Sequence, residues 1–401
     1  MISRNLVLSE ASIQAYILAF AIFLLMKPVF IWPFLIVATM LAGAALFLSI
    51  FLQKRVFRKN ILLAILVFSM LVFYKFLQGA SAFGIIFFAV SSSLIVLIDE
   101  SVLFKSFLHI KRLLAVIIFM GGGLWVLHLL TGDSSLFFIG YLPDQYILSE
   151  SKVEAGSQYA LYPFSTRIVY NLVSEFYRFQ SIFDEPGYIG TTLALILTID
   201  KCSLKGITNK ILFVGGLISL SLAFYVIFFV YYVAYLAPKP IKFLKVIFLA
   251  FIIALSLYST DTGEAIVDKF LIERLYIQDG KFSGNNRAGG LLNQQFNYFL
   301  DKASLKEKVF GLHNYKHDGS SSIKQIPIKT GYLGVFLISS IFLAFIFFYR
   351  SRVNYASLVF MMVFFLSAFQ RPGIVDPEYI YLFIVGIALM GRPRRSPGFI
   401  E

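Results

Sequence analysis

The chain has 401 residues, of which 59% are hydrophobic and 14% are charged, whereas an ordinary globular chain has roughly 25% charged residues. A chain with so few charged residues cannot form a polar surface around a water-soluble core. Lipid must therefore be its solvent. This excludes a disordered chain, a secreted disulfide scaffold and a cytosolic enzyme. The single cysteine, Cys202, cannot form an intrachain disulfide. The net charge of +13 has to be interpreted from the positions of the charges relative to the membrane.

Long apolar segments separated by short charged clusters predict an all-α polytopic membrane protein with one membrane domain over residues 1–401. Because a span needs roughly 17–25 apolar residues, we expect about twelve transmembrane helices. They lie near 12–26, 29–52, 61–77, 81–98, 113–130, 187–200, 211–220, 222–236, 246–258, 329–348, 354–370 and 378–390. The stretch 211–236 is either one long tilted helix or two short helices with a break around Ser219–Ser221. We interpret the first span as a retained anchor.

The distribution of lysine and arginine predicts the orientation. Short loops rich in these residues stay in the cytoplasm. With twelve spans, the inside segments hold 19 basic residues, whereas the short outside segments hold only Lys27, Lys75 and Arg371. An eleven-span arrangement would place a basic segment outside, so twelve spans with both termini in the cytoplasm are favoured. Topology therefore accounts for the net charge, and no nucleic-acid partner is expected.

Two long segments are predicted outside, at 131–186 and 259–328. Loops longer than about 12–15 residues are usually functional or disordered. Both segments contain amphipathic stretches, and in the second the apolar residues of 266–275 and of 291–300 each fit one helical face. We expect such helices to lie along the membrane surface or to cap the bundle.

The first long segment ends in a run of charged and polar residues that leads into a span. Pro186 is well placed to begin that helix. If the preceding turns are helical, Arg178, Ser181 and Glu185 share one face, and an ionisable cluster at the membrane edge indicates function. Two alternatives stay open: Arg178 and Glu185 pair with each other, or Asp184 takes the role given to Glu185.

The second long segment contains two further candidates. Residues 283–290 are rich in Gly and Asn, which allows close backbone approach to an anion, and Arg287 adds a bidentate donor for phosphate. His313 and His317 lie four residues apart and could act as base or hydrogen-bond donor near neutral pH. Because no carboxylate or cysteine completes a ligand set, no metal is expected there.

Two features near the C-terminus complete the set of candidates. Gly331 and Gly334 open the tenth predicted span, and small residues at this spacing let helices pack closely. The turn at 370–378 carries Arg371, Asp376 and Glu378 near the same outer surface. This turn either completes a site with the other outside residues or is a capped connection.

This arrangement resembles the superfamily of O-antigen polymerases (Wzy-like) and O-antigen ligases of bacterial envelope polysaccharide assembly. The matching pieces are 178–187, 217–223, 283–287 and 311–334, and the resemblance is concentrated in about 170–340. It implies a GT-C-like glycosyltransferase of the bacterial inner (cytoplasmic) membrane. The implied donor is an undecaprenyl-diphosphate-linked oligosaccharide, used without a metal, a nucleotide sugar or another cofactor.

In the polymerase, the resemblance implies transfer of a growing glycan onto a new lipid-linked repeat unit at the external face of the membrane. Arg178 and Arg287 would stabilise the diphosphate leaving group, with Arg274 in reserve. Glu185, His313 and His317 are the candidates, in no order, for the base that serves the acceptor hydroxyl. A chain-length regulator is a possible partner.

Two other functions remain as alternatives. A ligase would carry a His-Asn pair at a set distance before Gly-x-x-Gly, and His313-Asn314 lies too far from Gly331 for that pattern. A lipid-linked oligosaccharide flippase or transporter would place charges deep inside the spans, whereas here the ionisable clusters gather in the outside segments. The sequence does not distinguish O-antigen, capsule and exopolysaccharide.

Overall fold

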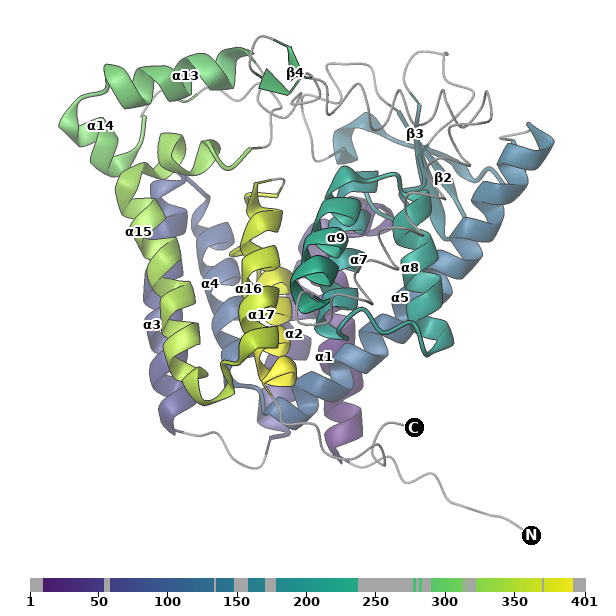
Figure 1. The fold of residues 1–401 in the computed structure, drawn as a ribbon, viewed down its shortest axis with the longest axis horizontal. Coiled ribbons are helices and arrows are strands. Elements are labelled where there is room, and N and C mark those ends of the chain that lie inside the picture. Colours follow the sequence, from purple (N-terminus) through teal and green to yellow (C-terminus); the bar gives the residue numbers. More distant parts are fainter. Residues whose placement is uncertain are drawn as a thin grey trace.

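A computed structural model describes residues 10–53, 58–132, 135–147, 158–169, 178–236, 277–278, 281–282, 290–312, 315, 322–369 and 371–391. These residues form a bundle of helices that carries two small sheets and two short helices at one end (Figure 1). Almost all of the buried side chains belong to one continuous apolar core.

The helices of the bundle follow the predicted spans. They are α1 (Glu10–Leu25), α2 (Leu35–Phe51) after the 3-10 turn η1 (Val29–Phe34), α3 (Arg58–Leu77), α4 (Ala82–Leu97), α5 (Glu100–Thr131), α7 (Pro186–Ile199), α8 (Ile207–Ile218), α9 (Leu222–Leu236), α15 (Gln325–Phe348), α16 (Tyr355–Ala368) and α17 (Pro377–Met390). Eleven predicted spans coincide with one of these helices, and the segment 246–258 lies outside the described residues. The break between α8 and α9 falls at Leu220, whose φ of 47° cannot continue a helix.

Four stretches in the described part of the chain are long and apolar enough to cross a membrane: Val29–Phe51, Asn60–Leu77, Glu100–Thr131 and Gln325–Phe348. The other apolar helices have 10–17 residues, and a helix of about 14 residues reaches about 21 Å, less than the roughly 30 Å of a hydrocarbon core. The chain is thus a helical membrane protein, and the total of twelve spans stays a prediction.

Burial separates central from peripheral helices. Every residue from Ile189 to Ile199 in α7 is buried, as is every residue of α17 except Leu389. A helix that is apolar on all sides belongs inside a bundle. In contrast, α2, α3 and α15 expose large apolar side chains to the surroundings, among them Ile36, Phe47, Leu62, Phe336, Leu343 and Phe347. Lipid is the solvent that suits such a surface.

The expectation of an all-α chain is corrected in the long outside segments. In the first, β1 (Gly140–Leu142), β2 (Gln158–Tyr162) and β3 (Ser165–Val169) form an antiparallel sheet in the order β1-β2-β3. Aromatic and β-branched residues favour these strands. The sheet lies close to α5, since a side chain at Gly121 would meet the carbonyl oxygen of Phe164 at 2.3 Å. A second, two-stranded sheet joins β4 (Ile277–Gln278) to β5 (Lys281–Phe282).

Of the two predicted amphipathic helices, the second is confirmed, whereas residues 266–275 lie outside the described residues. It is α13 (Gly290–Asp301), which buries Leu292 and Phe299 against Ile328 at the start of α15. Together with α14 (Leu305–Phe310) it covers one end of the bundle (Figure 1).

Gly331 kinks α15 with a φ of 65°, and a side chain there would meet the carbonyl oxygen of Val309 at 2.1 Å. Gly331, the first glycine of the Gly-x-x-Gly pair, therefore allows α15 to pack closely against the backbone of α14, and not against another helix of the bundle.

Ion pairs join segments that were predicted on the same side of the membrane. Arg352 contacts Glu100 at 3.3 Å, and Lys111 pairs with Asp200; all four residues lie in segments predicted inside. At the opposite end, where the sheet and α13 lie, the ion pairs of Lys75 with Asp376 and of Arg371 with Glu185 join segments predicted outside. The bundle therefore has two distinct polar ends, as the charge distribution predicts.

Gly190 in α7 is expected to be essential for the contact with the α8–α9 break. A side chain at this position would meet Ser221 Cβ at 2.3 Å, so Gly190→Ala should lower the free energy of unfolding by about 1–3 kcal/mol. Thermal unfolding in detergent, followed by tryptophan fluorescence, measures this effect. Gly123→Ala is the control, because its new methyl group would meet nothing within 4 Å and alanine favours a helix. Equal melting temperatures for both variants would contradict close α7–α9 packing.

Candidate functional site

Seven ionisable side chains gather at the end of the bundle that carries the sheet. They come from the ends of α1 and α3, the segment before α7, the turn between α16 and α17, and the first turn of α17. We call this group the charged cluster, and it consists of Lys27, Lys75, Asp184, Glu185, Arg371, Asp376 and Glu378. A group of buried and half-buried charges at the edge of a membrane bundle is unfavourable unless the charges pair, which makes it the first candidate for function.

Arg371 and Glu185 form the closest pair of the charged cluster. Nη2 of Arg371 donates to Oε2 of Glu185 at 2.6 Å, and the guanidinium lies 5.6 Å from the ring centroid of Tyr188. Burial alone would lower the pKa of Arg371, but the carboxylates of Glu185 and Asp184 raise it above its ordinary value. The guanidinium is therefore a permanent positive charge held between carboxylates and an aromatic ring.

Lys75 forms the second pair. Its Nζ lies 3.8 Å from Oδ1 of Asp376 and 3.8 Å from the ring centroid of Phe88. A cation over an aromatic face is attracted by the ring quadrupole. The ammonium group of Lys75 is thus oriented by two neighbours while its side chain keeps 17% of its surface exposed.

Lys27 follows α1 and has a φ of 51°. Its carbonyl oxygen accepts a hydrogen bond from Nε1 of Trp32 at 3.0 Å, which holds the turn between α1 and η1. Burial lowers the pKa of Lys27, but Asp376, Glu378 and Asp184 together raise it above its ordinary value. At neutral pH the charged cluster therefore holds Lys27 as a cation beside the guanidinium of Arg371.

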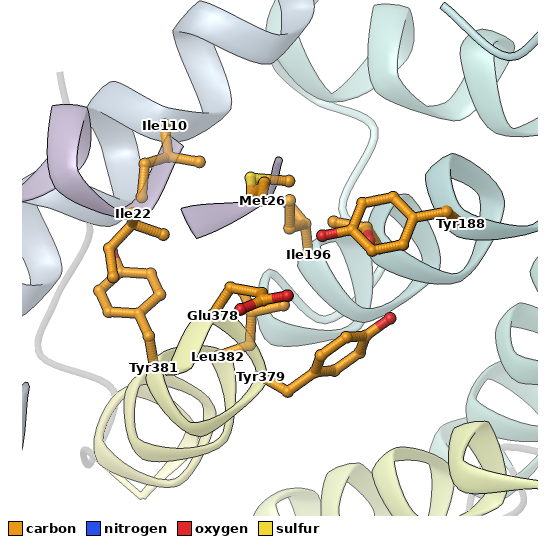
Figure 2. Close-up of a pocket in the computed structure, with 10 residues that line it drawn as sticks. Ile22, Met26, Ile110, Tyr188, Ile196, Glu378, Tyr379, Tyr381 and Leu382 are labelled. Carbon is orange, nitrogen blue, oxygen red and sulfur yellow. The ribbon is translucent and has the colours of Figure 1, made fainter. Parts of the chain in front are cut away.

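Glu378 lies deeper than the two ion pairs. It is 6% exposed, and its Oε2 has no hydrogen-bond partner among the described residues. Figure 2 shows its carboxyl group facing a pocket shared with Tyr188, Tyr379 and Met26. The cavity volume is about 10 Å³, which is room for about one water molecule. A sugar cannot enter this pocket, but a proton or a water can.

The two central helices both begin at the charged cluster. Glu185 precedes Pro186 at the start of α7, and Asp376 precedes Pro377 at the start of α17. Proline is favoured at the first helical position, and an acidic residue before it suits the positive end of the helix dipole. Neither carboxylate caps its helix through its side chain. Both turn instead towards cations on other elements.

Arg178, the other predicted arginine in the described residues, contacts the α8–α9 break. Its Nε donates to the carbonyl oxygen of Ser219 at 3.2 Å, and its Nη2 donates to that of Leu220 at 2.7 Å. Carbonyl groups at a helix end lack intrahelical partners. Arg178 therefore stabilises the break between α8 and α9. Its predicted contact with a diphosphate stays a prediction.

The conditional prediction of helical turns before Pro186 is wrong for residues 178–185. This segment is irregular, with Ser181 at a φ of 53°. The hydroxyl of Thr166 in β3 donates to the carbonyl oxygens of Ser181 and Phe183, both at 3.0 Å. Bonding to the sheet thus replaces a helical turn, and Arg178 and Glu185 do not share a helical face.

The other predicted site residues lie outside the described part of the chain. They are Arg274, Arg287, His313 and His317. Their predicted roles in binding diphosphate and in proton transfer stay predictions. Asp184, the alternative to Glu185, is a member of the charged cluster and contributes to the electrostatics of both Lys27 and Arg371.

The sequence assigned no role to Lys27 and Lys75, and it offered Arg371 only as part of a turn that either completes a site or is a capped connection. Lys27, Lys75 and Arg371 are the only basic residues of the short segments that were predicted outside. A lysine or arginine in a short segment predicted outside departs from the rule that such residues stay in the cytoplasm. A nearby carboxylate that forms an ion pair with it is the simplest local reason. The signal was thus present in the charge distribution, but the partners lie far away in the sequence.

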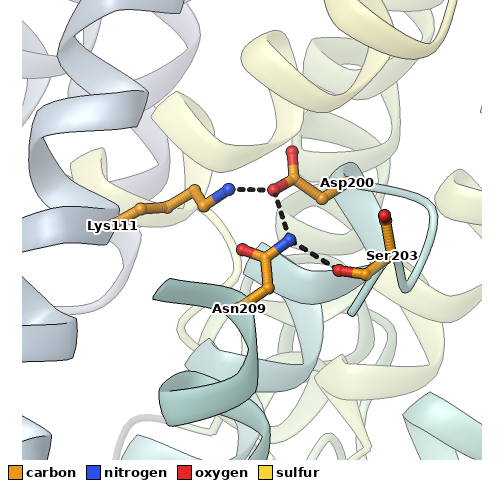
Figure 3. Close-up of polar contacts among 4 residues, drawn as sticks. All are labelled: Lys111, Asp200, Ser203 and Asn209. Carbon is orange, nitrogen blue, oxygen red and sulfur yellow. Dashed lines mark hydrogen bonds and ion pairs between the residues drawn. The ribbon is translucent and has the colours of Figure 1, made fainter. Parts of the chain in front are cut away.

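A second polar group lies at the opposite end of the bundle (Figure 3). Lys111 of α5 pairs with Asp200, which also accepts a hydrogen bond from Nδ2 of Asn209 at 3.0 Å. The same Nδ2 donates to the carbonyl oxygen of Ser203 at 2.7 Å. These contacts fasten α5 to the α7–α8 connection, and they explain the burial of Lys111 without a ligand.

Known proteins give no guide to this site. No family model, curated protein or solved structure matches the chain. Within the described ranges, no group of three or more His, Cys, Asp or Glu residues is arranged to hold a metal ion. The function must therefore be inferred from the chemistry of the charged cluster.

Arg178→Ala should destabilise the protein whatever its effect on activity. Removing two charge-assisted hydrogen bonds and leaving their carbonyl acceptors unpaired costs about 1.5–3 kcal/mol. A lower melting temperature in detergent is expected, whereas replacing the exposed Arg112 by alanine should change it little. An unchanged melting temperature for Arg178→Ala would show that the α8–α9 break does not depend on this side chain.

Proposed function

We propose that this protein is an integral membrane glycosyltransferase that polymerises undecaprenyl-diphosphate-linked oligosaccharide repeat units into a surface polysaccharide. The reaction would take place at the external face of the bacterial inner membrane. The observation that supports it is the charged cluster, in which Lys27, Lys75 and Arg371 meet four carboxylates at one end of an apolar bundle.

The chemistry of a lipid-linked donor suits this location. Its polyprenyl tail stays in the bilayer, so its diphosphate group lies at the level where the helices begin. Cations placed there offset the negative charge that develops on the leaving diphosphate. The N-termini of α7 and α17 add partial positive charge at the same place.

Glycosyl transfer also needs a group that accepts the proton of the acceptor hydroxyl. In this proposal the acceptor oxygen forms a bond to the anomeric carbon, while the bond from that carbon to the diphosphate oxygen breaks. The hydroxyl proton passes to a carboxylate or a histidine. Glu185 is the described candidate, and His313 and His317 remain as the alternatives proposed from the sequence.

One observation favours a second candidate function. Glu378 is a buried ionisable group in the first turn of a central helix, and such groups are typical of proton-coupled transporters. Under this alternative the protein would move lipid-linked oligosaccharide across the membrane. The two candidates differ in their product, because only the polymerase lengthens the glycan.

A turnover assay distinguishes the candidates. Purified protein in nanodiscs, given lipid-diphosphate-linked repeat units with EDTA present, should yield a ladder of lengthened glycans on a gel. Lys75→Met removes a cation and keeps an apolar stem, so we expect a rate at least about tenfold lower. Lys205→Met, on an exposed residue at the opposite end of the bundle, is the control and should leave the rate unchanged.

Absence of a ladder from authentic substrate, with flipping in liposomes, would favour the transporter. A glycan moved onto lipid A-core would instead favour a ligase. If a folded Lys75→Met variant forms the ladder at the wild-type rate, the protein is still a polymerase, but Lys75 is not part of its site.

The proposed orientation can be tested by labelling single cysteines in cells. Cys202 is the single cysteine of the chain, so a Cys202→Ala background has no thiol to label. A membrane-impermeant maleimide applied from outside the inner membrane should label cysteine placed at Tyr298 and should fail to label cysteine placed at Lys205 before lysis. Both positions are exposed. The reverse labelling would invert the proposed topology.

A further inference from the structure

The ion pair of Arg371 leaves part of its guanidinium unused. A guanidinium offers five N–H donors, and Nη2 is engaged with Oε2 of Glu185 at 2.6 Å. Its Nε is buried and has no hydrogen-bond partner among the described residues. Because buried donors are normally satisfied, this nitrogen is a donor of Arg371 for which the described residues supply no acceptor.

The pair lies where a ligand can reach it. The side chains of Arg371 and Glu185 are 15% and 30% exposed, whereas the deeper Glu378 is 6% exposed. The ring of Tyr188 covers one side of the guanidinium, which leaves its edge to bind acceptors. Planar donors on a guanidinium edge match two oxygens of a phosphate group.

Glu185 is the group that holds this edge while no ligand is present. Its carboxylate precedes Pro186 at the start of α7, yet it does not cap that helix through its side chain. A carboxylate and a phosphate compete for the same donors of one guanidinium. An anion that binds the edge formed by Nε and Nη2 therefore competes with Glu185 for Nη2.

We propose that Arg371 binds the diphosphate group of a lipid-linked donor, and that Glu185 is an internal competitor which the incoming diphosphate displaces. The identity of the anion rests on the proposed function. The competition itself rests on the geometry of the pair. Arg371 is thereby a binding residue in addition to Arg178, Arg287 and Arg274.

Displacement has a consequence for the transfer step. While Glu185 accepts a hydrogen bond from Arg371, its Oε2 is not free to take a proton. After the donor binds Arg371, that oxygen accepts the proton of the acceptor hydroxyl as the acceptor oxygen bonds to the anomeric carbon. The electron pair of the broken carbon–oxygen bond leaves on the diphosphate. Donor binding thus releases Oε2 of Glu185 from Arg371 before the transfer step.

Binding of farnesyl diphosphate to the purified full-length protein in detergent tests the competition. Glu185→Gln should tighten binding about tenfold, because the competing charge is gone, and Arg371→Lys should weaken it about tenfold, because the bidentate contact is lost. In the Arg371→Lys background, Glu185→Gln should change the affinity by less than about threefold. Farnesol has the isoprenoid tail without the anion, and inorganic diphosphate has the anion without the tail. Measuring both in parallel separates the contributions of the two parts to the affinity.

Glu100→Gln is the matched control, because Glu100 pairs with Arg352 at the opposite end of the bundle and its loss should leave binding unchanged. A misfolded variant cannot bind more tightly, so the gain expected for Glu185→Gln is not an artefact of damage. If the variants change the affinity for inorganic diphosphate in the same way, the anion site is supported, and its ligand is a soluble diphosphate and not a lipid-linked one.

Three results would overturn the proposal. They are no binding of farnesyl diphosphate by the wild type, equal binding of farnesol, and tightening by Glu185→Gln that persists without Arg371. If the variants bind as predicted but the protein transfers no glycan from authentic substrate, the binding proposal is supported and the proposed function is contradicted.

Discussion

The free-energy cost of taking a charge out of water governs this structure. An isolated ion in a low-dielectric interior is strongly unfavourable, and breaking a buried pair costs about 3–5 kcal/mol. The central helices α7 and α17 accordingly keep charged side chains to their ends. Arg371 with Glu185 and Lys75 with Asp376 lie at one end of the bundle, whereas Lys111 with Asp200 lies at the other.

The two polar ends differ in how well their groups are satisfied. At one end, Lys111 pairs with Asp200, and the amide nitrogen of Asn209 donates to Asp200 and to the carbonyl oxygen of Ser203, while Oδ1 of Asn209 has no hydrogen-bond partner within the described ranges. At the other end, Nε of Arg371 and Oε2 of Glu378 are buried without hydrogen-bond partners within the described ranges. Satisfied polar networks stabilise a fold, whereas unsatisfied groups are expected where a ligand or a proton is bound. The unsatisfied atoms of the second end belong to ionisable side chains, whereas the one at the first end belongs to a neutral amide, and this makes the second end the candidate site.

Arg178 shows why a motif residue needs its three-dimensional context. Its position before Glu-Pro-Gly predicts a role in binding anions, and the fold uses it to hold the carbonyl groups of Ser219 and Leu220. The run before Pro186 also follows the sheet instead of forming a helix, because Thr166 supplies hydrogen-bond partners from β3. Local sequence does not reveal such partners, since they come from another strand.

The sequence by itself determined the membrane class, the positions of the described bundle helices and the helix start at Pro186, whereas it left open whether 211–236 forms one helix or two. These features follow from apolar length, proline geometry and charge distribution, which are local properties. Only the tertiary structure decided that Lys27, Lys75 and Arg371 meet Glu185, Asp376 and Glu378. These residues lie up to about 350 positions apart, and the packing of the helices whose ends carry them brings them together.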